Sequence, residues 1–310
     1  MKKICPNCGK EFECKHNKDC FCMQYIITKE NLAKMREKFD NCLCENCLTL
    51  YTDKTNNMTE RPLIFVTNDD GYLSNGIKAL WEILKPMGKV VVVAPAKEMS
   101  GQSHSITVGK PLRLECIEKQ EDFELYSLEG TPVDCVKMAF DKVLCRKPDF
   151  LFAGINHGSN ASINTMYSGT MAAVMEGCSE GVASVGFSLC EDDKNSDLSN
   201  CLPFVNKISK EVVTNGLIKD ICLNVNFPKG KIKGIRVGHQ AKGYWSEDFK
   251  ISEKEDEKNI YWLGGQYHCE DNSSSADWNM INEGFAAVVP MQVDFTAYKV
   301  LDTMKNRFEK

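Results

Sequence analysis

The stretch 63–76, LIFVTNDDGYLSNG, constrains the fold of this 310-residue chain more than any other. Four consecutive apolar residues at 63–66 are typical of a strand that is buried on both faces. The strand leads into Asp69 and Asp70, two adjacent carboxylates whose repulsion is costly unless a positive charge lies between them. A hard divalent cation is the simplest such charge. We therefore expect a buried parallel strand that delivers two carboxylates to a metal site.

Composition narrows the class of protein. The chain is 43% hydrophobic, which is enough for a sizeable core. Its net charge of −5 argues against a general nucleic-acid or membrane-surface binder. No apolar run approaches the length of a membrane span, and the basic N-terminus lacks the apolar segment of a signal peptide. We expect a cytoplasmic protein with no membrane or nucleic-acid partner.

Cysteine is unevenly distributed, because eight of the sixteen lie in the first 47 residues. The pairs Cys5-x-x-Cys8 and Cys44-x-x-Cys47 have the spacing of zinc knuckles, in which two thiolates of one tight turn bind one ion. Eight thiolates could hold two zinc ions, with His16 able to replace one thiolate, and so small a module needs a metal to fold. A disulfide-linked or redox module is the alternative, which a reducing compartment disfavours. The candidate zinc ligands are Cys5, Cys8, Cys14, Cys20, Cys22, Cys42, Cys44 and Cys47.

The chain divides into three parts: a cysteine-rich module at 1–50, a polar linker at 51–61 and a main domain at 62–310. In the main domain, buried runs alternate with amphipathic helices, which predicts β-α-β units and a parallel sheet. The predicted strands of this kind are 63–68, 90–93, 150–154, 182–189 and 221–227.

The pattern changes at about residue 234. Short alternating segments at 235–239, 259–263 and 285–290 suggest hairpins rather than β-α units. The last residues are predicted to form a surface helix or an arm onto a partner subunit. We therefore expect a hairpin and arm extension over about 234–310.

Oxygen-bearing side chains gather at the carboxyl ends of the predicted strands, where open parallel sheets bind ligands. Asp69 and Asp70 are joined there by Ser100, which follows the second strand, and by Asn156 from the third. These oxygens, with a net charge of −2, suit one Mg²⁺ or Mn²⁺ ion. A helix that begins at Ser168 offers its first amides to a phosphate. This arrangement predicts metal-assisted hydrolysis, in which the ion activates a water, or in which one carboxylate acts as a base or a nucleophile.

The same segments resemble the SurE family of stationary-phase survival nucleotidases. Five motifs in the right order, followed by a similar C-terminal segment, carry the resemblance over residues 62–300. They are TNDDG at 67–71, APAKEMSGQSHSIT at 94–107, EGTPVDCV at 129–136, GINHGSN at 154–160, YSGTMAAVMEG at 167–177 and PMQVDFTAY at 290–298.

The resemblance implies a metal-dependent 5′-nucleotidase, a phosphoric monoester hydrolase that releases phosphate from nucleoside 5′- and also 3′-monophosphates and, in some members, from short polyphosphate. It implies a Rossmann-like three-layer α/β sandwich and a homodimer or homotetramer built through C-terminal arms. Where several members carry a histidine considered as a proton donor, this chain has Tyr298. The cysteine-rich stretch resembles small bacterial modules of the CWC type, which implies zinc but no defined activity. The implied metal ligands are Asp69, Asp70, Ser100 and Asn156, the implied catalytic residues are Asn68, Asp69 and Asp70, and the implied phosphate contacts are Asn68, Ser168, Gly169 and Thr170.

Two other functions remain open at this point. An oxidoreductase on the same broad fold needs a G-x-G-x-x-G turn after the first strand, and residues 67–76 do not supply one. A non-enzymatic nucleotide-binding or interaction protein that acts through the cysteine module need not keep the acidic ligands, yet all are present. Tyr244, Trp245 and Trp262 could stack on a base, although packing is the commoner use of such side chains. The resemblance also suggests that Asp277 contacts a nucleotide from a partner arm.

Overall fold

The computed structural model describes residues 2–14, 22, 29–51, 61–252 and 259–309. The chain forms two compact units, Met1–Arg61 and Pro62–Lys310. Cys20 and His16, two of the predicted zinc ligands, lie outside the described residues.

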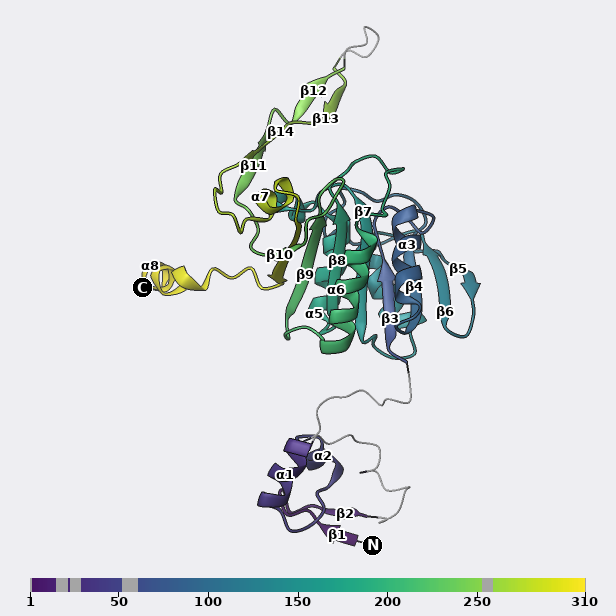
Figure 1. The fold of residues 1–310 in the computed structure, drawn as a ribbon, viewed down its shortest axis with the longest axis vertical. Helices are drawn as coiled ribbons and strands as arrows, with labels where there is room; N and C mark the ends of the chain where they lie inside the picture. The colour runs from purple at the N-terminus through teal and green to yellow at the C-terminus, as the bar shows by residue number, and fades with distance from the viewer. Residues whose placement is uncertain (1, 15–21, 23–28, 52–60, 253–258, 310) are drawn as a thin grey trace. The chain divides into compact units, whose positions relative to one another are not determined.

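The N-terminal unit is small. A ribbon of β1 (Lys2–Ile4) and antiparallel β2 (Glu11–Glu13) is followed by α1 (Lys29–Lys38) and α2 (Glu45–Leu48), as Figure 1 shows. Its buried core consists of Cys5, Leu43, Cys44, Cys47 and Leu48. Three of these five side chains are candidate metal ligands, so the apolar core is very small.

The second unit is built on one nine-stranded sheet with the order β10-β15-β9-β8-β7-β3-β4-β6-β5. Neighbouring strands are parallel except for the pairs β15–β9 and β5–β6. The predicted mostly parallel sheet is therefore confirmed. The strands are β3 (Leu63–Thr67), β4 (Lys89–Pro95), β5 (Leu114–Lys119), β6 (Phe123–Leu128), β7 (Phe150–His157), β8 (Ala183–Leu189), β9 (Ile221–Phe227), β10 (Ile235–Val237) and β15 (Ala286–Gln292).

Helices cover both faces of this sheet and complete the three layers (Figure 1). On one face α3 (Asn75–Leu84) and α6 (Leu202–Asn215) enclose a core that includes Phe152, Phe187 and Phe227. On the other face α4 (Pro132–Met138), extended by a π-helical turn at Ala139–Val143, and α5 (Gly169–Ser179) enclose a second core. Each large side chain so buried contributes about 1.5–3 kcal/mol to the free energy of unfolding.

The helix α3 shows how the sequence specifies these layers. Ser74 caps it by accepting a hydrogen bond from the amide of Ile77. Ile77, Leu80, Trp81 and Leu84 fall on one helical face and are all buried. A capping serine followed by apolar residues at helical spacing therefore specifies this helix.

Two of the predicted C-terminal hairpin segments are instead strands of the main sheet. β10 pairs in parallel with β15, and β15 pairs antiparallel with β9. Alternation in a short segment indicates a strand but does not specify its partner, which is why the sequence pattern was misleading there. The hairpins lie between these strands: β11 (Gly243–Ser246) pairs with β14 (Gln266–Cys269), and β12 (Phe249–Ile251) with β13 (Tyr261–Leu263), extending away from the sheet (Figure 1).

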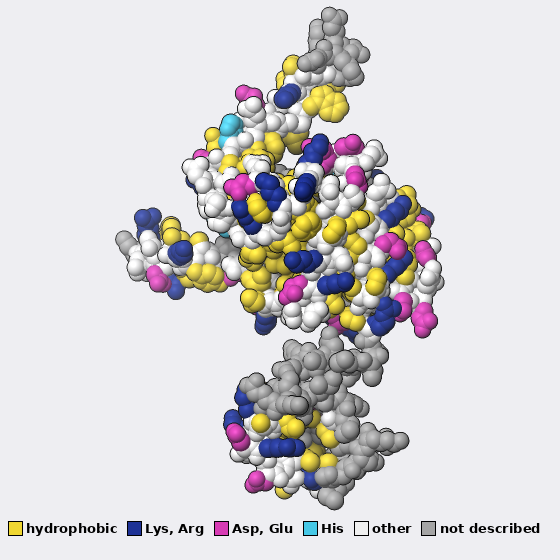
Figure 2. All heavy atoms as spheres, in the orientation of Figure 1, with side chains coloured by type: hydrophobic (Ala, Val, Ile, Leu, Met, Phe, Trp, Pro, Cys, Tyr) yellow, Lys and Arg dark blue, Asp and Glu magenta, His cyan; other side chains and the backbone are white. Residues whose placement is uncertain are grey.

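The hairpins and the C-terminal arm expose many apolar side chains. The arm ends in α8 (Leu301–Phe308), in which no residue is buried. Phe295 and Phe308 are 79% and 81% exposed, and Figure 2 shows hydrophobic atoms along the arm and the hairpins. None of the helices in the described part of the chain is long and apolar enough to span a membrane.

The buried carboxylate of Glu124 links the three strands at one edge of the sheet. Glu124 of β6 accepts hydrogen bonds from Lys89 Nζ at 2.9 Å, Lys119 Nζ at 3.1 Å and the Tyr126 hydroxyl at 2.7 Å. Burial would raise the pKa of Glu124, but these partners lower it to about 2. The cluster links β6 to β4 and β5.

Candidate active site

Four of the predicted site residues meet in one cleft, at the carboxyl ends of the parallel strands. Asp69, Ser100, Asn156 and Ser168 all line it. The cleft has a volume of about 720 Å³, within the range of roughly 300–1,000 Å³ that is usual for ligand pockets. An α/β sheet is expected to bind its ligand at this edge.

Asp69 follows β3 closely and is only 3% exposed. Thr170 Oγ1 donates a hydrogen bond of 2.5 Å to Asp69 Oδ1. Burial raises the pKa of Asp69 to about 6; the Thr170 bond opposes this rise and the charge of Asp70 adds to it. A carboxylate in such surroundings is charged at neutral pH at a free-energy cost that a nearby cation would remove.

Asp70 is an orphaned carboxylate. Both of its oxygens are buried and receive no hydrogen bond of normal geometry from any residue that the structure describes. Burial raises the pKa of Asp70, and the amide of His157 and the charge of Lys194 offset that rise only in part. Asp70 lines a smaller pocket beside the cleft, and His157 lines both. Unpartnered buried carboxylates are rare in native proteins, so this one points to a bound ion or water.

Asn68 holds the turn that carries the two carboxylates. Its Nδ2 donates to the Gly71 carbonyl at 3.0 Å and to Ser74 Oγ at 2.9 Å. Gly71 has a φ of +96°, which glycine adopts readily, so the chain turns directly after Asp70. Asn68 is fully buried and is not among the described residues that line the cleft.

The start of α5 packs against Asp69. Ser168 caps this helix by accepting a hydrogen bond from the Met171 amide at 3.0 Å, and it lines the cleft. A Cβ atom on Gly169 would lie 2.8 Å from Asp69 Cβ and 2.9 Å from its Oδ2. Only glycine therefore lets the helix start approach the carboxylate. Thr170, which was predicted to contact phosphate, is fully buried and uses its hydroxyl on Asp69.

Ser100 and Asn156 reach the cleft from two different strand ends. Ser100, in the loop after β4, donates its Oγ proton to Glu98 Oε1 at 2.9 Å, which leaves the oxygen lone pairs for a cation. Glu98 is also paired with Lys194, which together with Ser100 lowers the pKa of Glu98. Asn156, at the end of β7, donates Nδ2 to the Gly158 carbonyl at 2.9 Å, so its side-chain oxygen is the atom it can offer.

The sequence reasoning missed a buried asparagine network behind the cleft. Asn160, which lines the cleft, donates Nδ2 to Ser188 Oγ at 2.8 Å, and its amide donates to Asn226 Oδ1 at 2.9 Å. Asn226 in turn donates to Asn224 Oδ1, and Asn224 donates to the Asn160 carbonyl, both at 2.8 Å. The signal was present in ICLNVNF, where two asparagines alternate with apolar residues in a buried strand. Their side chains share one face of β9 and fix the Asn160 loop.

The far end of the cleft is aromatic. Trp245 and Trp278 line it, and Trp245 Nε1 donates to Asn164 Oδ1 at 2.8 Å, which orients the indole. Tyr267 packs between the two tryptophans, with ring centroids 5.8 Å and 4.1 Å away. Of the other aromatic candidates, Tyr244 stacks on His268 and Trp262 is 64% exposed on β13.

Two C-terminal residues that the sequence singled out are not among the described residues that line the cleft. Asp277, at the start of α7 (Asp277–Asn282), is fully buried and accepts hydrogen bonds from the amides of Ser162, Ala241 and Trp278. The suggestion that it reaches a nucleotide from a partner arm is therefore wrong. Tyr298 is 63% exposed, bonds to Asp294 and is not among the described residues that line the cleft.

The charge balance of the cleft fits a divalent cation. Among the described residues that line it, Lys229 is the only lysine or arginine, and it is paired with Glu191. Asp69 and Asp192 contribute negative charge. A phosphate dianion would be repelled from such a wall unless a metal ion entered with it, and the oxygen donors are those that Mg²⁺ and Mn²⁺ prefer.

The predicted zinc ligands separate into two groups. Cys5, Cys8, Cys44 and Cys47 form one cluster in which all four sulfurs lie within 4.8 Å of one another. Burial would raise the pKa of Cys5, but the backbone amides of Cys44, Cys8 and Asn7 lower it to about 6. Cys14, Cys22 and Cys42 are outside this cluster, which is the only such group among the described residues.

Comparison with protein families gives two matches. Residues 64–247 match the family described as survival protein SurE. Residues 5–49 match the family described as cysteine-rich CWC.

This chain matches several known proteins over nearly their full length. A protein named 5′-nucleotidase SurE from Bacteroides fragilis is 42% identical over 250 residues, which is 80% of this chain and 98% of that protein. A protein of the same name from Flavobacterium johnsoniae is 46% identical over 249 residues, 79% of this chain and 96% of that protein. The crystal structure of the SurE protein from Aquifex aeolicus superposes with a TM-score of 0.67 at 35% identity and covers 79% of this chain and 99% of that one.

Proposed function

Because the chain belongs to the SurE family, we propose that it is a divalent-metal-dependent 5′-nucleotidase that hydrolyses nucleoside 5′-monophosphates to nucleoside and phosphate. The observation that carries the metal-dependent part is the pair of adjacent buried carboxylates, Asp69 and Asp70. Asp69 lines a cleft whose size suits a nucleotide, and Asp70 lines the smaller pocket that shares His157 with it.

Asp69, Asp70, Ser100 and Asn156 would hold one Mg²⁺ or Mn²⁺ ion. When bound, such an ion neutralises phosphoryl charge and makes a water nucleophilic at neutral pH. The fit rests on the unpartnered oxygens of Asp70, on the raised pKa of Asp69 and on the scarcity of other cations in the described cleft wall.

The protein itself orients the phosphate through the start of α5. The first amides of this helix lack partners within the helix and carry partial positive charge, so they stabilise negative charge on the transferring phosphoryl group. Ser168 Oγ accepts a hydrogen bond from one of these amides, that of Met171, and Ser168 also lines the cleft. Thr170 does not contact the phosphate in this arrangement; its hydroxyl donates to Asp69 and orients that carboxylate.

The nucleoside would extend toward the aromatic end of the cleft. Trp245 is held by Asn164 and partly exposed, so its ring offers a flat apolar face to a base. Asn160 and Asn164 line the same cleft and can bond to a ribose hydroxyl. Stacking tolerates any base, so this arrangement favours broad use of nucleoside monophosphates.

A direct test measures phosphate release from AMP with Mg²⁺ or Mn²⁺ for wild type and Asp69→Asn. Loss of the carboxylate should remove most activity and lower the affinity for Mn²⁺ measured by calorimetry. Asp141→Asn is the matched control, because Asp141 is 72% exposed and lies on the π-helical turn after α4. If wild type hydrolyses neither nucleotides nor polyphosphate with any divalent ion, the proposal fails.

Three finer features remain part of this proposal. Hydrolysis of nucleoside 3′-monophosphates and of short polyphosphate would follow from a site that holds the phosphate more firmly than the nucleoside. A homodimer or homotetramer built through the C-terminal arm would cover the exposed Phe295 and Phe308, and light scattering on the purified protein tests it. A cytoplasmic location stays a prediction.

A further inference from the structure

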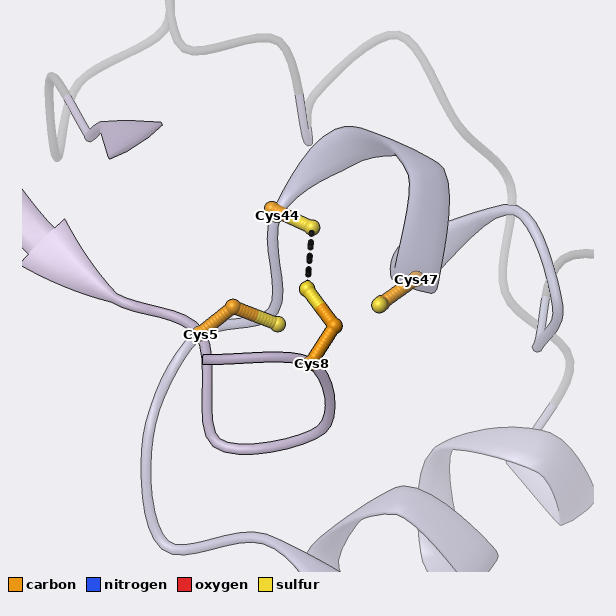
Figure 3. Close-up of side chains that lie close together, drawn as sticks. All are labelled: Cys5, Cys8, Cys44 and Cys47. Atoms are coloured by element: carbon orange, nitrogen blue, oxygen red, sulfur yellow. Dashed lines mark hydrogen bonds between the residues drawn. The ribbon is translucent and has the colours of Figure 1, made fainter. Parts of the chain in front are cut away.

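Four cysteine sulfurs of the N-terminal unit converge on one point. Cys5 and Cys8 lie on the turn after β1, and Cys44 and Cys47 lie at the start of α2. All four sulfurs are within 4.8 Å of one another, and those of Cys8 and Cys44 are 3.5 Å apart. Figure 3 shows the four side chains pointing toward one another from the two segments.

These distances fit a single tetrahedral ion. Zinc–sulfur bonds of about 2.3 Å place the sulfurs of a tetrahedral site about 3.8 Å apart, close to the spacing seen here. An iron–sulfur cluster places iron and sulfide between its thiolates and so holds them farther apart.

A side-chain donor also faces the sulfurs. Asn7 Nδ2 donates to Cys47 Sγ at 3.3 Å. Outer donors of this kind orient metal-bound ligands and balance their charge.

We propose that Cys5, Cys8, Cys44 and Cys47 bind one Zn²⁺ ion per chain and that this ion folds the N-terminal unit. Soft thiolate ligands in a tetrahedral set select zinc over the hard cations that suit the acidic cleft. The site is separate from the proposed nucleotidase chemistry, and it stands or falls independently of it.

The remaining described cysteines have other surroundings. Cys42 Sγ accepts a hydrogen bond from Lys3 Nζ at 3.6 Å, and the same ammonium donates to Asn41 Oδ1 at 2.8 Å. Cys22 packs against the small apolar core. The proposal therefore assigns one ion to four of the eight thiolates, while Cys14 is buried outside the cluster and Cys20 lies outside the described residues. The prediction of two ions on eight thiolates is tested by the metal count below.

The role in folding follows from the size of the core. Apart from the three ligands Cys5, Cys44 and Cys47, only Leu43 and Leu48 are buried in the hydrophobic cluster. The partly buried Phe12, Met35, Phe39 and Tyr51 pack around them. A unit with so small an apolar core usually needs a metal ion or another crosslink to fold. Zinc binding is coupled to folding in small thiolate modules, so the ion would supply the missing stability.

The first experiment counts and identifies the metal in the full-length protein. We expect one zinc per chain, and X-ray absorption should show four sulfurs at about 2.3 Å. Cys44→Ser should lose the zinc, whereas Cys42→Ser, two residues away on the same segment, should keep it. Cys47→His should retain the ion in a three-sulfur, one-nitrogen site that Cys47→Ala cannot form, which separates loss of a ligand from general misfolding.

The second experiment follows folding without using activity. Limited proteolysis of the full chain should leave the N-terminal fragment intact while zinc is bound and degrade it after chelation, with residues from about 62 onward resistant in both cases. Two zinc ions per chain, iron in place of zinc, equal zinc loss in Cys42→Ser and Cys44→Ser, or equal resistance after chelation would each overturn the proposal.

Discussion

Replacing Thr170 by valine tests whether Asp69 is held for a metal ion. Valine keeps the shape of threonine but removes the hydroxyl that donates to Asp69 Oδ1 at 2.5 Å. Thr170 is fully buried, so no water can readily replace the lost donor. The carboxylate then keeps its burial but loses the hydrogen bond that favours its charged form.

The size of the effect follows from the kind of hydrogen bond. A bond to a charged group contributes about 1.5–3 kcal/mol, which corresponds to about a 10- to 150-fold change in an equilibrium or a rate. Loss of partners that orient metal ligands in other proteins costs about 10- to 100-fold in affinity or activity. For Thr170→Val we therefore expect the Mn²⁺ affinity and the kcat/KM for AMP to fall together by about 10- to 100-fold.

The assays are calorimetric titration with Mn²⁺ and phosphate release from AMP over a range of Mn²⁺ concentrations. Thr67→Val is the matched control, because Thr67 is also fully buried, lies two residues before Asp69 and makes no hydrogen bond to a described carboxylate. The reasoning is refuted if Thr170→Val binds Mn²⁺ and hydrolyses AMP as wild type does, or if Thr67→Val is equally impaired.

Three further predictions concern the cleft and the sheet. Trp245→Ala should lower kcat/KM for AMP by about 5- to 150-fold, the equivalent of one base stack, and should leave kcat/KM for ribose 5-phosphate unchanged. The control Trp262→Ala should leave kcat/KM unchanged for both substrates. Gly169→Ala should abolish activity and cost about 1–3 kcal/mol of stability in thermal unfolding, because its Cβ would lie 2.8 Å from Asp69 Cβ. The pKa of Glu124 is about 2 in the folded protein and 4.5 ordinarily. The Glu124 carboxylate should therefore add up to about 3 kcal/mol to the free energy of unfolding above pH ~4.5, and this contribution should be lost as the pH falls toward ~2. In denaturant unfolding, Glu124→Gln should be less stable than wild type at neutral pH and equally stable near pH 2.

The sequence predicted the part of the fold in which local pattern and tertiary context agree. A run such as LIFV, bounded by polar residues, is typical of a strand covered on both faces, and the cap at Ser74 is a local hydrogen bond that needs no distant partner. The order of β10 and β15 in the sheet was not predictable in this way. The hairpins and α7 lie between them in the sequence, so their pairing is a long-range contact that a local pattern does not encode.

The candidate site was predictable as a gathering of residues but not as a set of contacts. Parallel strands bring Asp69, Ser100 and Asn156 to one edge whatever their side chains do. That Thr170 faces a carboxylate and not the cleft depends on the approach of α5, which the close packing at Gly169 permits. The roles assigned to these residues remain predictions that the variants above test.

The two proposed metal sites differ in ways that make them separable in one solution. Carboxylate and amide oxygens at the sheet edge select a hard ion, whereas the four thiolates of the N-terminal unit select a soft one. A chelator strips both, so loss of activity after chelation cannot by itself assign a role to zinc. If the sites are independent, adding back Mg²⁺ or Mn²⁺ alone should restore AMP hydrolysis while the N-terminal fragment stays sensitive to protease. Restoration that requires zinc as well would mean that the folding of the small unit controls the cleft.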